Sequence, residues 1–89
     1  MSDFLKVVLR KLSPPLFTVR ITDRAAVLTG GKASPALIRD FSEIARKNNI
    51  VSEWIWGLQT GNSIRLDFSS KISKGDRQRF RNISGIHAK

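Results

Sequence analysis

The cations of the C-terminal segment are the side chains whose type and spacing most clearly suggest a chemistry. Residues 70–82, SKISKGDRQRFRN, hold five Lys and Arg side chains and one carboxylate. Lys74, Arg77 and Arg81 recur at the spacing of neighbours on one side of a helix, and Arg79 flanks them. Such a row binds the phosphates of a polyanion without reading bases, because each neutralised phosphate releases counterions. The alternative is a solvated face that keeps the protein in solution.

The whole chain has the same excess of positive charge. Its 89 residues include 16 Lys and Arg against 7 Asp and Glu, which gives a formal net charge of +9. This balance attracts nucleic acid, an acidic protein or an anionic membrane surface. We expect nucleic acid, with Arg20 and Arg65 as further contacts. We expect no sequence-specific readout, because neither a helix-turn-helix spacing nor the aromatic submotifs of RNA-binding domains are found.

Side chains suited to catalysis are scarce. The single histidine, His87, lies close to the C-terminus, and Cys and Tyr are absent from the sequence. General acid-base and nucleophilic catalysis draw on these residue types, and a metal centre needs several ligands. We therefore expect a noncatalytic binding domain with no metal, no cofactor and no small-molecule substrate. The lack of Cys fits a reducing compartment, and no signal peptide is recognised, so we expect a cytoplasmic protein.

A second candidate site is the glycine-rich connection Gly30-Gly31-Lys32, which leads from a predicted strand into a predicted helix. Backbone amides at a helix start can hold an anion, and Lys32 would add a positive charge. The alternative is that the two glycines form a tight strand-to-helix turn, and this is the interpretation we favour. The segment is not a phosphate-binding Walker loop, because Ala33 follows the lysine where a metal-binding Ser or Thr is required.

Two hairpin patterns, each followed by a helical pattern, organise the chain that must position these residues. Alternating apolar and polar residues predict strands at residues 17–22, 25–29, 51–59 and 64–68. Helices are predicted after Ser34-Pro35, where Ser caps free amides and Pro occupies the first turn, and after Ser73. The order ββαββα predicts an α+β fold. We expect a two-layer sandwich in which the helices cover one face of a four-stranded antiparallel sheet.

Trp54 and Trp56 are two positions apart and therefore share one face of their predicted strand. If the helices cover that face, both rings belong to the core, which we expect because a small domain needs large apolar side chains. If the face is open, the rings could stack on single-stranded bases beside Arg20 and Arg65.

The chain is predicted to begin with an amphipathic helix and a Pro-Pro linker over residues 1–15, ahead of a single α+β domain at residues 16–89. The apolar side of this helix includes Phe4, Leu5, Val8 and Leu12. It could dock onto the domain, associate with a protein partner or lie on a membrane. The alternative function is therefore a protein-interaction or peripheral membrane module, in which case the protein would be peripheral to the membrane.

The C-terminal half contains SIRLDFSSKIS followed by QRFRNI, after an earlier GGK and a helix ending FSEIARKNNI. With these motifs the chain resembles, over residues 17–84, a small uncharacterised bacterial family, a domain of unknown function. The positions that carry the resemblance are Phe68, Ser69, Ile72, Gln78, Arg79, Arg81, Asn82 and Ile83. The resemblance implies no activity. Members often begin with a membrane-spanning segment, and this chain departs there with its short basic helix, so the resemblance implies that residues 1–15 lie at a membrane.

Overall fold

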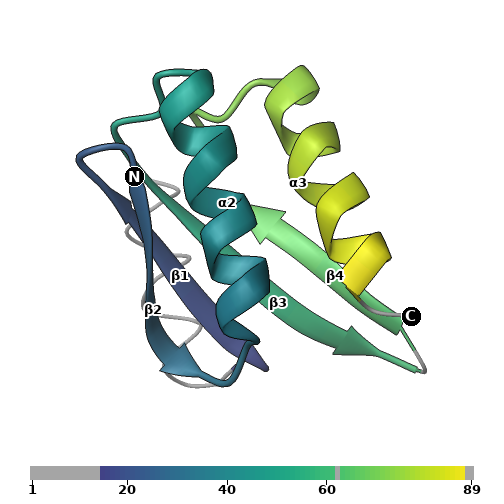
Figure 1. Ribbon diagram of the computed structural model, residues 1–89. Helices are drawn as coiled ribbons and strands as arrows, with labels where there is room; N and C mark the ends of the chain where they lie inside the picture. Colours follow the sequence, from purple (N-terminus) through teal and green to yellow (C-terminus); the bar gives the residue numbers. More distant parts are fainter. Residues whose placement is uncertain (1–14, 62, 88–89) are drawn as a thin grey trace.

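The computed structural model describes residues 15–61 and 63–87, which form two layers (Figure 1). The elements are β1 Phe17–Thr22, β2 Ala25–Gly31, α2 Pro35–Lys47, β3 Ser52–Thr60, β4 Ser63–Phe68 and α3 Lys74–His87. The strands form one antiparallel sheet in the order β2-β1-β3-β4, and both helices lie on the same face of it. The predicted ββαββα fold of the α+β class is confirmed. The predicted N-terminal helix, with Phe4, Leu5, Val8 and Leu12, lies outside the described residues.

The turn and helix-cap residues lie at the positions that the sequence predicts. The β1–β2 turn is formed by Asp23 and Arg24, both with positive φ, as tight hairpins require. Ser34 caps α2, its hydroxyl accepting a hydrogen bond from the Leu37 amide at 3.1 Å, and Asn48 ends the helix. Neither described helix has the length and apolar character needed to span a bilayer.

A cluster of aromatic and branched side chains between the two layers holds the fold together. Phe41 of α2 meets Phe80 of α3 edge to face, with ring centroids 5.1 Å apart. Phe80 also lies 6.0 Å from Phe68 of β4, so these rings join both helices to the sheet. From β1 and β3 the sheet adds Phe17, Val19, Ile21 and Ile55, all buried.

The register of the sheet decides which face the tryptophans occupy. Val19 pairs with Ile55, and Ile55 pairs with Phe68, so these three side chains face the helices. Trp54 and Trp56 alternate with Ile55 and therefore point away from the helices. Trp56 is only 1% exposed, as a core role requires, yet it lies outside the helix-side cluster. Trp54 is half-buried, so the expected core role fits Trp56 but only partly Trp54, and neither ring packs beneath α2 and α3.

Candidate polyanion-binding surface

The first turn of α3 places the cations that the sequence singled out. Ser73 caps the helix, since its hydroxyl accepts from the Asp76 amide at 3.2 Å and its carbonyl accepts from the Arg77 amide at 2.9 Å. The predicted capping residue is thereby confirmed. Lys74 is the first helical residue and is exposed. The cap fixes the direction in which α3 leaves the sheet, and with it the positions of the cations that follow.

Arg77 uses its guanidinium to hold the connection between β4 and α3. Its Nε donates to the Ile72 carbonyl at 2.8 Å, and one terminal nitrogen lies 3.3 and 3.4 Å from the carbonyls of Ser69 and Ser70. The same group lies over the Phe68 ring, 5.5 Å from its centroid. Arginine suits this position because its planar fork presents several donors at once. The side chain is thus committed to its own chain and positions the loop around it.

Arg81 lies one helical turn further along, on the same side of α3. Its guanidinium is 5.3 Å from the centroid of Phe68, and the residue is exposed. Lys71, in the loop that Arg77 holds, is exposed as well. No ion pair joins Lys71, Lys74 or Arg81 to a carboxylate within residues 15–61 and 63–87. We call these three cations the β4–α3 corner; β4 is an edge strand, so the corner is at the outer edge of the sheet.

The remaining predicted cations lie elsewhere. Arg79 forms an ion pair with Asp76 at 2.7 Å, and with Ile83 it lines a cavity between α2 and α3. Arg65 pairs in register with Leu58, so it lies on the face of the sheet that points away from α2 and α3. The structure therefore groups Lys74, Arg77 and Arg81, and separates Arg79, Arg65 and Arg20 from them. Sequence reasoning missed Lys71, whose only signal was its place in the basic segment 70–82.

The face of the sheet that points away from α2 and α3 carries a stacked group made of one arginine and two tryptophans. The Arg20 guanidinium lies 4.6 Å from the centroid of the Trp54 ring and donates to the Ser52 hydroxyl at 2.9 Å. The rings of Trp54 and Trp56 are nearly parallel, with an interplanar angle of 3° and centroids 6.2 Å apart. Trp54 therefore already stacks on two neighbours, which disfavours its use as a platform for a nucleic-acid base.

The glycine-rich connection behaves as a turn. Gly31 has a φ of +73°, and a Cβ on it would fall 2.7 Å from the Cα of Phe17, so only glycine fits. The Lys32 amide donates to the Leu16 carbonyl at 3.0 Å, while the Lys32 side chain is exposed. Gly30 pairs with Thr18 beside a register shift in the β1–β2 ladder. These contacts give the turn interpretation its physical basis.

Comparison with known proteins adds a family but no activity. A family model described as "Protein of unknown function (DUF3634)" matches residues 4–87. The searches of curated proteins and of solved structures gave no match. Within the described residues, no group of His, Cys, Asp and Glu side chains is placed to hold a metal ion. The match covers almost the whole chain and agrees with the resemblance to a domain of unknown function. The chain therefore belongs to the DUF3634 family.

Proposed function

We propose that this protein is a noncatalytic domain that binds a polyanion at the β4–α3 corner, and that this polyanion is nucleic acid. The observation that carries the proposal is that the cations there are exposed and form no ion pair in the described part of the chain. Lys71, Lys74 and Arg81 are exposed, and within the described residues no carboxylate neutralises them. Arg79, on the same helix, is paired with Asp76 and contributes less to the outward field. A net charge of +9 would steer polyanions toward this surface.

Arg77 positions the proposed site through hydrogen bonds to the β4–α3 loop. By donating to the carbonyls of residues 69, 70 and 72, it fixes the loop that carries Lys71 next to the first turn of α3. The cations of the corner would then meet a phosphate backbone as a preorganised group, with little side-chain and loop ordering left to oppose binding. The binding energy would be electrostatic, because no base-reading element accompanies the cations.

The salt dependence of binding follows from the number of cations. Three phosphate contacts give log K against log salt a slope of about −2.7, or roughly 40-fold weaker binding at 200 mM than at 50 mM salt. Fluorescence anisotropy with short single- and double-stranded DNA and RNA measures this slope. A double variant, Lys71→Glu with Lys74→Glu, removes two of the contacts and should reduce the slope to about −0.9.

A matched control separates the corner from the overall charge. Arg24→Glu with Arg39→Glu changes the net charge by the same amount, at the β1–β2 turn and on α2. This control should keep a slope close to that of the natural protein. Equal losses in both double variants would assign the binding to general charge and refute the corner as a site. No binding at the lowest salt would refute the function, and the alternative of a protein or membrane partner would take its place.

A further inference from the structure

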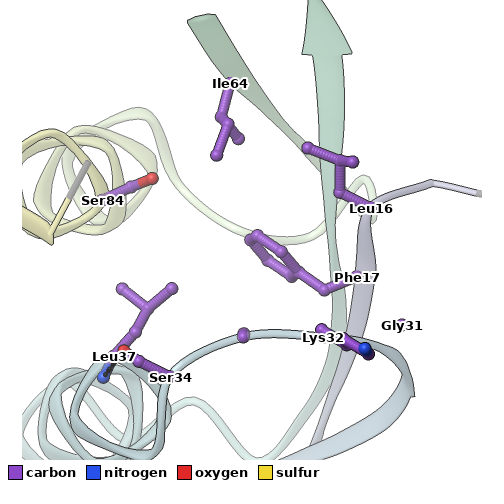
Figure 2. A pocket seen from close by; sticks show the side chains of 9 residues that line it. Leu16, Phe17, Gly31, Lys32, Ser34, Leu37, Ile64 and Ser84 are labelled. Atoms are coloured by element: carbon purple, nitrogen blue, oxygen red, sulfur yellow. Dashed lines mark hydrogen bonds between the residues drawn. The ribbon is translucent and has the colours of Figure 1, made fainter.

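A cavity of about 430 Å³ opens at one end of the sandwich, between the sheet and the helices. It is enclosed by the start of β1, the β2–α2 connection, the first turn of α2, the start of β4 and the last turns of α3 (Figure 2). Its walls are mainly apolar and include Leu16, Phe17, Leu37 and Ile64. The volume lies in the range of small-molecule sites. At about 30 Å³ per water-sized group, it accommodates roughly a dozen heavy atoms.

Ser84 of α3 lines this cavity and is buried, with 8% of its surface exposed. Figure 2 shows its hydroxyl oxygen directed into the cavity. Among the described residues this hydroxyl has no hydrogen-bond partner, whereas Ser69, the other buried serine, bonds both the Trp54 amide and the Glu53 carboxylate. Buried hydroxyls are nearly always paired, because leaving one without a partner costs free energy. An unpaired hydroxyl at an apolar cavity therefore offers a hydrogen bond to a polar atom of a bound molecule.

Lys32 supplies the second polar feature and lies on another side of the cavity from Ser84 (Figure 2). It lies two residues before Ser34, the N-cap of α2, where the helix dipole also favours negative charge. Within the described part of the chain, no carboxylate forms an ion pair with the Lys32 ammonium. The two features differ in kind, because Lys32 attracts an anion while Ser84 requires only a hydrogen-bonding atom.

We propose that this cavity binds a small amphiphilic carboxylate that carries a hydroxyl or carbonyl group away from its acid end. The apolar body would lie against Phe17, Leu37 and Ile64, the carboxylate would stay beside Lys32, and the second polar group would pair with Ser84. Charge complementarity selects an acid over an amine, and the apolar walls exclude fully polar anions. The site is separate from the β4–α3 corner, so it does not depend on the polyanion proposal.

The test uses 10-hydroxydecanoate, decanoate and 1,10-decanediol as probes, titrated into the full-length protein and followed by ¹H–¹⁵N NMR. 10-Hydroxydecanoate should bind saturably and shift the amides of Gly31, Lys32 and Ser84. Decanoate should bind about fivefold more weakly, the value of one neutral hydrogen bond. In Ser84→Ala the two acids should bind equally, because the hydroxyl of the probe has lost its partner. A preference that persists in Ser84→Ala refutes the role of Ser84.

Two further variants test the charge and the location. Lys32→Met should weaken both acids and leave 1,10-decanediol unaffected, whereas Lys47→Met, at the other end of α2, should change neither. Ile64→Trp fills the cavity from a side chain that is 40% exposed, so the fold should tolerate it, and binding of all three probes should be lost. Unchanged binding in Ile64→Trp, or no saturable binding by the natural protein, overturns the proposal.

Discussion

Ser69 and Ser84 are the serines buried among the described residues, and replacing each by alanine should change the stability of the domain in opposite directions. The Ser69 hydroxyl accepts from the Trp54 amide at 2.9 Å and donates to the Glu53 carboxylate, beyond the last ladder pair of β3 and β4. Ser69→Ala leaves the partly buried Trp54 amide without its partner, which costs about 1–3 kcal/mol, and removes a hydrogen bond to a charged group. The sum is a loss of about 2–4 kcal/mol, a large part of the roughly 5–15 kcal/mol typical of a whole domain.

Ser84→Ala removes a hydroxyl that makes no hydrogen bond within the described chain, so no partner is left unsatisfied. The desolvation cost of that hydroxyl disappears, and alanine is the better helix former, so the domain should gain about 1 kcal/mol. Gly85→Ala is the control for helix propensity. Its new Cβ meets nothing within 4 Å, so it reports the propensity gain of Gly to Ala at this turn alone, about 1 kcal/mol, from which the smaller gain of Ser to Ala is scaled. In Ser84→Ala the removal of the buried hydroxyl should raise stability beyond the roughly 0.5 kcal/mol that the helix-propensity difference between Ser and Ala explains.

Urea unfolding followed by tryptophan fluorescence measures both changes, because Trp54 and Trp56 lie in the sheet. A shifted midpoint at constant m reports stability itself. For a domain of this size, 1 kcal/mol shifts the melting temperature by about 4–8 °C, so the two variants should be separated by well over 10 °C. If Ser84→Ala destabilised the domain as much as Ser69→Ala, the Ser84 hydroxyl would have a partner, and the reasoning about the cavity would fail.

Three further substitutions test how the fold positions its surface. Gly57→Ala puts a Cβ 2.7 Å from Cδ2 of the buried Phe17 ring and closer to two other ring atoms. Urea unfolding should therefore show a loss of about 2–4 kcal/mol in the free energy of unfolding, and a loss below about 1 kcal/mol would contradict this packing. Gly31→Ala should cost at least about 1 kcal/mol in the same assay, because its φ is positive and the clash is with backbone; a neutral result would mean the turn can rearrange. Arg77→Lys keeps the charge but loses the planar guanidinium that binds three carbonyls, so the free energy of unfolding should fall by about 1–2 kcal/mol. Nucleic-acid affinity, measured by fluorescence anisotropy on the folded protein, should stay nearly constant. Weaker binding at unchanged stability would instead make Arg77 a direct phosphate contact.

The elements themselves could be predicted because their signals are local. Residues 17–22 and 64–68 alternate with a period of two, and the structure has strands at Phe17–Thr22 and Ser63–Phe68. Ser34 before Pro35 marked the start of a helix, and α2 begins there. The order of two hairpins and two helices then leaves few ways to bury the apolar faces, and the two-layer α+β sandwich is one of them.

The face of the tryptophans could not be predicted in the same way. Trp54 and Trp56 alternate with Ile55 and Gly57, so the strand has apolar or small residues on both sides. The pairing of Val19 with Ile55 settled the question, because register carries a whole set of side chains to one face. Gly57 is needed there, since the Phe17 ring occupies the space where another residue would place its Cβ.

What the sequence determined by itself was the fold class, the helix caps and the charge, since each depends on composition or on neighbours within a few positions. Tertiary structure decided what each cation does. Arg77 and Arg81 have the same charge on one side of α3, yet the first is bound to loop carbonyls and the second remains exposed. It also decided the cavity, which joins Phe17, Lys32 and Ser84 from segments far apart in the chain. Contacts between distant segments arise only when the layers pack, so no local pattern contains them.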